Sequence, residues 1–265
     1  MKYTVIQNDG VCGICGYIWQ TLRVMWHYPE CKYYVDFSKN CQYADSSVKS
    51  TDNVWEYYFE QPHIQTYPSA EEISTTIYKI IDVPESEFRD VFMKNASYEY
   101  ISKRRLEYGN IIAKYLKLKP HIEEKINNFV STNFKGKKVL GVHFRGTDHP
   151  DKREVFEYLQ TIKNKAVDYD VIFCASDEAA RYNALKTVFG KKVISYDSIR
   201  SASSHPLHHS SDPAYYSSIP TYKLGEDVII EAFLLSKTDF IFCCSNSNVN
   251  YLARAINPTL PYQAL

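Results

Sequence analysis

Hydrophobic and polar positions alternate in blocks along the chain, and these blocks predict a layered α/β protein. A short apolar strand is expected at residues 3–6, followed by a loop that contains glycines. Residues 17–27 then carry apolar side chains every three or four positions, which predicts a helix. Another strand is expected at residues 32–37. The order strand, loop, helix, strand is typical of the beginning of a layered α/β domain.

The middle of the chain has the periodicity of helices. It extends over residues 85–134 and is interrupted at Pro120, which favours a new helix start. The polar segment 134–138 ends this pattern. We therefore predict a domain boundary there, with an N-terminal domain at residues 1–135 and a C-terminal domain at residues 136–265.

The second half returns to short apolar runs separated by helical patterns. Runs that are almost continuously apolar are typical of a parallel sheet covered by helices on both faces. The simplest architecture is two Rossmann-like, doubly wound domains that face each other across a cleft. The expected strands are at residues 139–144, 171–175, 192–195 and 239–244, and the expected helices at residues 154–166, 178–189, 226–236 and 248–256.

Composition and charge exclude several classes of protein. Lysine plus arginine equals aspartate plus glutamate, 31 against 31, so the chain has no net positive charge that would attract nucleic acid or an anionic membrane. The first residues lack an apolar stretch of signal-peptide length, and the most apolar run, 228–244, is interrupted by charged residues. We expect no transmembrane segment and a cytoplasmic protein. Seven cysteines, an odd number, make a disulfide framework unexpected in that compartment.

Polar clusters follow three predicted strands of the C-terminal half. In a parallel sheet, ligands bind at the carboxyl ends of the strands, where helix N-termini present free N–H groups. An arginine, small hydroxyl residues and amides at such ends suit a diphosphate. Each of these residues also has a purely structural explanation that the sequence leaves open. Arg145 would form a salt bridge, Ser176 and Asn246 would cap helices, and His143 would lie in the core. The clusters are residues 143–148, 176–178 and 245–248.

Three of these segments resemble, in order, the signatures of a known family. Residues 141–148 are similar to the first signature of the fucosyltransferase superfamily that includes nodulation fucosyltransferases and core α1,6-fucosyltransferases. Residues 175–178 resemble its second signature, and residues 225–240, which run into 245–249, resemble its third. The N-terminal half is similar only loosely, through the loop after the first strand and through residues 53–60.

The resemblance implies a GT-B fold and an inverting transferase that moves fucose from GDP-fucose to a carbohydrate acceptor without a metal or other cofactor. Arg145 would hold the donor β-phosphate, and Ser247 and Asn248 would hold the diphosphate at a helix start. Glu231 matches an acidic position that accepts hydrogen bonds from guanine N1–H and N2–H. The other residues that the resemblance places in the donor pocket are His143, Asp148, Ser176, Asp177 and His208, the last in a loop that acts as a lid.

The match to the family is incomplete where the catalytic base is expected. Core α1,6 enzymes carry two successive arginines where this chain has Arg145 and Gly146, and Arg153 stands where their acidic base lies. Direct displacement needs a base for the acceptor hydroxyl. Asp9, after the first strand, and Glu154 are the two candidates. The structural alternative for Asp9 is that it caps the following turn.

Alternatives from other classes remain at this stage. Cys12 and Cys15 have the C-x-x-C spacing of thiol oxidoreductases, and together with Cys31 and Cys41 they form a candidate zinc set. Residues 168–170 have the D-x-D pattern of metal-dependent transferases, but they precede a strand, which predicts a surface turn. The same fold also suits a transferase for another nucleotide sugar, or a non-catalytic module that binds glycans or nucleotides.

Overall fold

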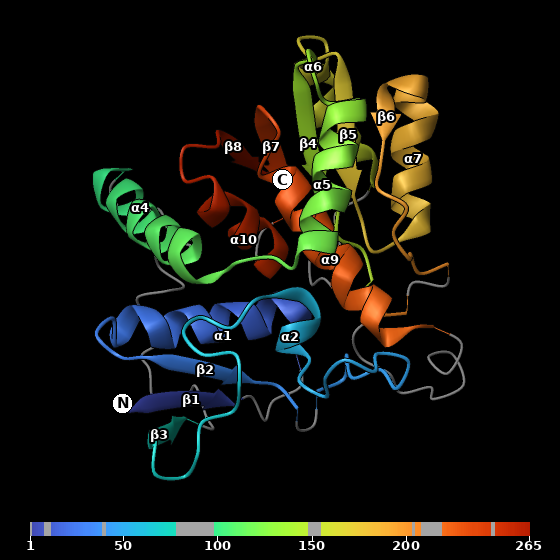
Figure 1. Cartoon of the computed structure of the whole chain (residues 1–265). Helices are drawn as coiled ribbons and strands as arrows, with labels where there is room; N and C mark the ends of the chain where they lie inside the picture. The colour runs from blue at the N-terminus through green and yellow to red at the C-terminus, as the bar shows by residue number, and fades with distance from the viewer. Residues whose placement is uncertain are drawn as a thin grey trace.

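The computed structural model describes residues 2–7, 12–38, 41–77, 98–147, 155–202, 205–207, 219–244 and 247–265. Its strands form two parallel sheets, one of three strands and one of five, with helices packed around and between them (Figure 1). This confirms the expectation of an α/β fold with parallel sheets.

The three-stranded sheet belongs to the N-terminal part of the chain. Its order is β2-β1-β3, with β1 (Tyr3–Gln7) in the middle, β2 (Tyr33–Asp36) on one side and β3 (Ile73–Ile77) on the other. Both pairs are parallel. The helix α1 (Ile14–His27) connects β1 to β2 and is buried along most of its length, because its apolar residues fall on more than one face. Trp55–Tyr58 forms the short helix α2.

Two helices lead from this sheet to the next. They are α4 (Tyr98–Tyr115) and α5 (Pro120–Asn133), and Pro120 occupies the first turn of α5, where its missing N–H costs no hydrogen bond. Gly136 then has φ of 73°, a left-handed conformation that glycine adopts without strain. The polar segment expected at residues 134–138 is therefore a turn that leads into the second sheet.

The five-stranded sheet has the order β6-β5-β4-β7-β8 and is parallel throughout. Even-numbered residues of β4, such as Leu140 and Val142, pack with Tyr158 and Ile162 of α6 on one face. Odd-numbered positions face the other side, where α9 and α10 lie. The sheet is thus doubly wound. Its strands are β4 (Val139–His143), β5 (Val171–Ala175), β6 (Val193–Ile194), β7 (Phe240–Cys243) and β8 (Tyr262–Ala264). Its helices are α6 (Val155–Ala166), α7 (Ala179–Phe189), η2 (Gly190–Lys192), α9 (Thr221–Leu235) and α10 (Asn248–Ile256).

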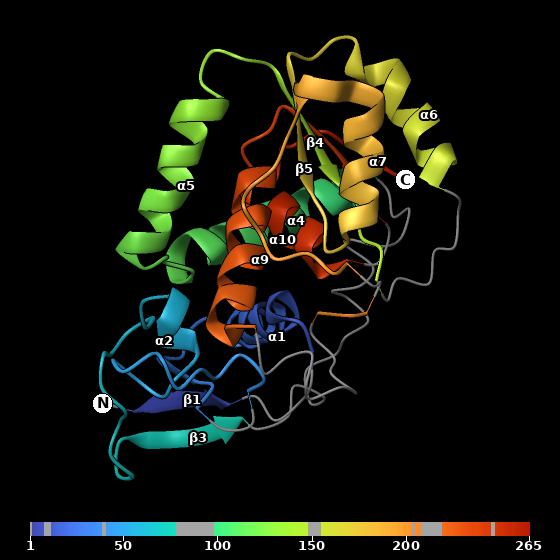
Figure 2. The same ribbon diagram turned by 90° about the vertical axis from the view of Figure 1, so that its right-hand side faces the viewer.

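The two sheets share a hydrophobic core. One cluster of buried residues includes Ile6 and Val35 from the three-stranded sheet and Phe173 and Ile241 from the five-stranded sheet. Figure 2 shows how α9 runs from the upper sheet down to α1 and α2, so that it belongs to both layers. The division of the chain into two domains at residue 135 stays a prediction.

The helix α9 begins five residues earlier than predicted, at Thr221 instead of residue 226. The sequence disfavours a helix through Gly225, because glycine is a poor helix former. A Cβ atom at Gly225 would lie 2.3 Å from the Tyr58 hydroxyl oxygen. Glycine at this position therefore permits α9 to approach α2 closely, and tertiary packing outweighs helix propensity.

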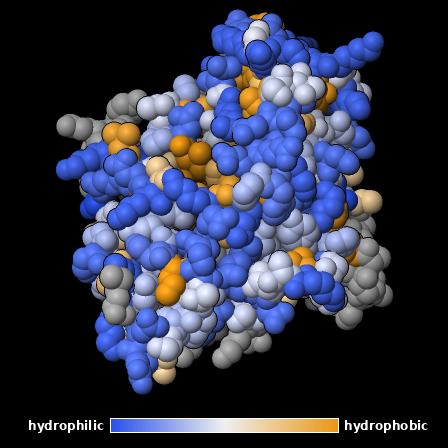
Figure 3. Space-filling model, viewed as in Figure 1, coloured by the Kyte–Doolittle hydropathy of each residue, from blue (hydrophilic) through white to orange (hydrophobic). Residues whose placement is uncertain are grey.

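The face of the molecule drawn in Figure 3 is mainly polar. In the view of Figure 3, hydrophobic residues are scattered among hydrophilic ones and do not gather into one large patch. Within the described ranges, no helix combines the length and the apolar character that crossing a membrane requires.

Candidate functional site

The candidate site lies where the order of the five-stranded sheet reverses. From β4 the chain continues to β5 on one side, whereas the later strand β7 pairs with β4 on the other side. In open α/β sheets, ligands bind in the crevice outside the carboxyl ends of the strands at such a switch point. The segments that leave β4 and β7 there contain Arg145 and the start of α10.

Arg145 begins a loop that is held in shape by Asp177. The carboxylate of Asp177 accepts hydrogen bonds from the Gly146 backbone N–H at 2.8 Å and from the Thr147 hydroxyl at 2.8 Å. The Arg145 Nε atom lies 3.9 Å from the same carboxylate. The Arg145 side chain is 21% exposed, so it is partly accessible from solvent, while Asp177 holds the loop that carries it.

A side chain at position 146 would meet two neighbouring side chains at very short distances. A Cβ atom at this position would be 1.8 Å from Glu178 Oε2 and 2.7 Å from Arg181 Nε. Glu178 and Arg181 form an ion pair of 3.1 Å, and both side chains are largely buried. A larger residue after Arg145, such as a second arginine, would therefore have to displace this ion pair.

The Ser176 side chain forms its hydrogen bonds with backbone atoms. Its hydroxyl donates to the Phe144 carbonyl at 2.6 Å and accepts from the Glu178 N–H at 3.2 Å, and the residue is 2% exposed. These contacts join the ends of β4 and β5. The structural alternative weighed from the sequence, a helix cap, is wrong for Ser176, because the N-cap residue of α7 is Glu178. The Ser176 hydroxyl instead holds the turn after β5 in place.

The N-terminus of α10 carries a buried hydroxyl without a partner. Ser247 is the N-cap residue and is fully buried, yet its Oγ makes no hydrogen bond to any described residue. Leaving such a group unsatisfied costs about 1–3 kcal/mol, which a ligand oxygen at the helix end would recover. Asn248, the first residue of α10, is exposed. An anion is also favoured here by the free N–H groups and the positive end of the helix dipole.

The N-terminus of α1 meets the N-terminus of α10. Trp19 Nε1 donates to the Asn248 carbonyl at 3.1 Å, and a Cβ atom at Gly16 would lie 3.4 Å from the Asn248 amide nitrogen. Arg145 is close enough for its charge to act on the Cys15 thiol. Two helix N-termini and one guanidinium therefore converge between the two sheets, and all three favour negative charge.

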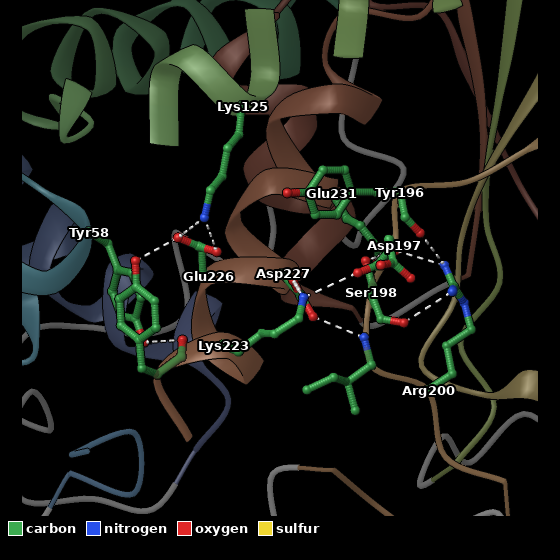
Figure 4. A network of polar contacts seen from close by, with 12 residues as sticks. Tyr58, Lys125, Tyr196, Asp197, Ser198, Arg200, Lys223, Glu226, Asp227 and Glu231 are labelled. Carbon is green, nitrogen blue, oxygen red and sulfur yellow. Dashed lines mark hydrogen bonds and ion pairs between the residues drawn. The ribbon is translucent and has the colours of Figure 1, made fainter. Parts of the chain in front are cut away.

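Glu231 lies on α9, on the side of the five-stranded sheet opposite α6 and α7. Its carboxylate accepts a hydrogen bond from Ser198 at 2.7 Å and pairs with Arg200 at 3.3 Å, as Figure 4 shows. Burial raises the pKa of Glu231 to about 8, although Arg200 and Ser198 act in the opposite direction. Ser198 and Arg200 were missed in the sequence, although they follow the predicted strand at residues 192–195 at its carboxyl end.

The same helix carries two further buried carboxylates, and these connect α9 to its neighbours (Figure 4). Glu226 accepts from Lys125 of α5 at 2.7 and 2.8 Å and from the Tyr222 hydroxyl at 2.6 Å. Asp227 accepts from Lys223 at 2.7 Å and from the Ile199 N–H at 2.9 Å. Asp227 thereby fixes the segment that contains Ser198 and Arg200, and burial raises the pKa of Asp227.

The cysteines do not have the properties of a redox or zinc site. Burial raises the pKa of the Cys12 and Cys15 thiols to about 12, whereas a reactive C-x-x-C thiol needs a lowered pKa. Cys41 lies near Cys12, and its pKa is also raised by burial. The described parts of the chain contain no group of three or more metal-binding side chains, so Cys31 does not complete a zinc set.

The remaining predicted site residues divide into two groups. His143 is the last residue of β4 and is 4% exposed, which places it inside the sheet, in line with the structural alternative. The others, Asp9, Asp148, Glu154 and His208, lie outside the described residues, as do Ser245 and Asn246.

Comparison with known proteins gives matches at the level of structure. No family model matches the sequence, and no curated protein sequence matches it. The structure of the fucosyltransferase NodZ from Bradyrhizobium is similar, with 14% identity, a TM-score of 0.55, and coverage of 96% of this chain and 92% of NodZ. The R284K mutant of FUT1 of Arabidopsis thaliana, solved in complex with GDP, has 10% identity and a TM-score of 0.55, and the match covers 100% of this chain and 70% of FUT1.

POFUT1 in complex with GDP-fucose is also similar. The identity is 10%, the TM-score is 0.53, and the match covers 100% of this chain and 98% of POFUT1. At these identities the likeness establishes the fold. This chain therefore has the fold of these fucosyltransferases over nearly its whole length, as the resemblance in the sequence predicted.

Proposed function

We propose that this chain transfers fucose from GDP-fucose to a carbohydrate acceptor. The observation that carries the proposal is the meeting of Arg145, the N-terminus of α1 and the N-terminus of α10 with its unpartnered Ser247 hydroxyl, at the switch point of the five-stranded sheet. This arrangement suits a diphosphate. The fold that carries it is shared with fucosyltransferases solved with GDP or GDP-fucose.

The diphosphate would lie against the helix ends. Ser247 and the free N–H groups of α10 would donate to its oxygens, with Asn248 beside them. Arg145 would contact the β-phosphate with its planar, permanently charged guanidinium. As the bond to the sugar breaks, negative charge accumulates on that phosphate, so the contribution of Arg145 grows in the transition state.

The guanine base would be read by Glu231. A carboxylate accepts hydrogen bonds and donates none, which matches the N1–H and N2–H groups of guanine. Ser198 and Arg200 hold one oxygen of Glu231 in place, and no described side chain donates to the other. The proposed reading of guanine therefore uses a carboxylate whose orientation is already fixed.

The sugar would be transferred by direct displacement with inversion, without a metal. The guanidinium and the helix ends supply the positive charge that Mg²⁺ supplies in other transferases. The acceptor hydroxyl needs a base, for which we propose Asp9, in the segment after β1, or Glu154, just before α6.

The proposal is tested by donor turnover. The full chain is incubated with GDP-fucose, GDP-mannose or UDP-glucose and with a panel of oligosaccharides, and nucleotide release and fucosylated products are followed by mass spectrometry. We expect products from GDP-fucose. Products from UDP-glucose alone would support a transferase for a different nucleotide sugar, and GDP binding without turnover of any GDP-sugar would support a non-catalytic module.

A further inference from the structure

An open pocket of about 360 Å³ lies at the carboxyl end of the three-stranded sheet. It is formed by the last residues of β1 and β2, by residues 51–53 and by Tyr67. Its volume falls within the range of small-molecule sites, ~300–1,000 Å³. The proposed donor site does not use it.

The polar groups of the pocket are held in fixed orientations. Gln7 Nε2 donates to Asp36 Oδ2 at 2.6 Å, and the Ser38 N–H donates to Asp36 Oδ1 at 3.0 Å. Asn53 Nδ2 donates to the Val35 carbonyl at 2.7 Å. Because these side chains are already held by hydrogen bonds, little of their conformational entropy is lost when a ligand binds.

Two tyrosines supply an aromatic wall. Tyr67 is 51% exposed and packs edge to face against Tyr34, with 5.2 Å between the ring centroids. The Tyr34 hydroxyl donates to Glu56 Oε1 at 2.9 Å, which fixes its ring. An exposed aromatic face beside hydrogen-bonding groups suits a ligand with apolar C–H surfaces and many hydroxyls. Sugar rings have both properties.

The acidic residues of the pocket indicate which kind of sugar it would bind. Among the described residues that line it, Asp36 and Asp52 are acidic and none is basic. Carboxylates accept hydrogen bonds from hydroxyl groups but repel anions. A nucleotide, a phosphate or an acidic sugar is therefore disfavoured, whereas a neutral sugar is favoured.

The pocket lies within reach of the proposed donor site. Gln7, at its edge, is five residues before Cys12, so the two are at most ~18 Å apart along an extended chain. Cys12 in turn contacts the start of α1, where a Cβ atom at Gly16 would lie 2.9 Å from Cys12 Sγ and 3.4 Å from the Asn248 amide. A short oligosaccharide is long enough to extend from this pocket to the donor sugar.

We propose that this pocket binds a neutral sugar ring of the acceptor, away from the ring that receives the fucose, and excludes acidic sugars. Tyr67 stacks on the ring, and Asp36 accepts hydrogen bonds from its hydroxyls. The role as an acceptor subsite rests on the proposed transferase function, but binding of the sugar itself does not.

Saturation-transfer NMR on the full chain with GDP present tests the proposal. The probes are four neutral oligosaccharides (lactose, maltotriose, cellotriose and chitotriose) and 3′-sialyllactose, which adds one acidic residue to lactose. We expect at least one neutral probe to bind with a millimolar Kd. Tyr67→Ala and Asp36→Asn should each weaken its binding at least about tenfold, as the loss of one good contact does.

The matched control is Tyr28→Ala, because Tyr28 is a similarly exposed tyrosine, 43%, that does not line the pocket. It should bind the probes as the unmodified chain does. Binding of no neutral probe, unchanged binding by both pocket variants, or 3′-sialyllactose bound as tightly as lactose would each overturn the proposal. Turnover of GDP-fucose is measured separately, so sugar binding without turnover contradicts the transferase and not the pocket.

Discussion

At the scale of single residues, Arg145 combines a fixed loop with a partly exposed side chain. Replacing it with alanine removes the charge that offsets the departing diphosphate, so kcat should fall by a factor on the order of 10² or more. GDP affinity should fall less, because part of the interaction forms only in the transition state. Lysine should rescue partly, since it cannot hold two oxygens in one plane. Steady-state kinetics with GDP-fucose measures all three quantities.

The control for Arg145 is Arg104→Ala. Arg104 is a partly exposed arginine on α4 that pairs with Glu107, outside the proposed site. Its kcat should equal that of the unmodified chain, and circular dichroism melts should show that both variants are folded. A folded Arg145→Ala enzyme with near-normal kcat would mean that the donor does not bind at the end of β4.

Glu231 gives GDP binding a dependence on pH. Burial raises the pKa of this carboxyl group to about 8, and guanine N–H groups require its ionised form. GDP affinity should therefore rise between pH 6 and pH 8, by up to about fifty-fold if only the ionised form binds, and level off above the pKa. Calorimetric titration with GDP across this range measures the effect. Glu231→Gln should bind more weakly and lose the pH dependence, whereas a flat profile in the unmodified chain would contradict the role of Glu231.

At the scale of elements, the ion pair between Lys125 of α5 and Glu226 of α9 connects these two helices. Glu226 is 3% exposed, so Lys125→Met leaves a buried carboxylate without its lysine partner, beside the Tyr222 hydroxyl and, 3.8 Å away, His121 Nε2. Lys125 itself is 42% exposed, which reduces the expected cost. We expect a loss of about 1–2 kcal/mol in the free energy of unfolding, measured by urea denaturation. Lys137→Met, at an exposed lysine, should change it by less than about 0.5 kcal/mol, and equal effects of the two variants would contradict the argument.

Strong periodicity made most elements predictable, and weak periodicity explains those that were missed. The helix α10 was predicted with its bounds, and β1, β4, β5 and β7 were placed to within about one residue, because their apolar residues are continuous or regularly spaced. The strand β3 was missed because Ser74 and Thr75 are exposed at a sheet edge. The strand β8 has only three residues, all exposed. Edge strands bury few apolar side chains, so the alternation of apolar and polar residues in their sequence is weak.

The candidate site was predictable where its residues follow strands directly. Arg145, Asp177 and Ser247 were predicted to lie at one site because the carboxyl ends of parallel strands meet at one edge. The partners of Glu231 were missed, since Ser198 and Arg200 are about thirty positions away in the sequence and no periodicity relates them to α9. The pocket near Tyr67 was missed for the same reason, because it forms only when four separate segments come together.

At the scale of the whole molecule, all the positive charge for the reaction would come from the chain itself. We therefore expect transfer from GDP-fucose to continue in excess EDTA at an unchanged rate. The control adds Mg²⁺ or Mn²⁺ after chelation, and the rate should stay the same. An absolute requirement for either ion would show that the diphosphate binds in a different way.

The central claim is that a guanosine diphosphate binds between the two sheets, at the end of β4 and the start of α10. The most direct measurement compares the melting temperature of the full chain with GDP, UDP and ADP at equal concentrations, because a ligand that binds the folded state stabilises it by mass action. The account predicts that GDP raises the melting temperature, that UDP and ADP do not, and that Ser247→Ala reduces the shift. Stabilisation by UDP or ADP with none by GDP would contradict it.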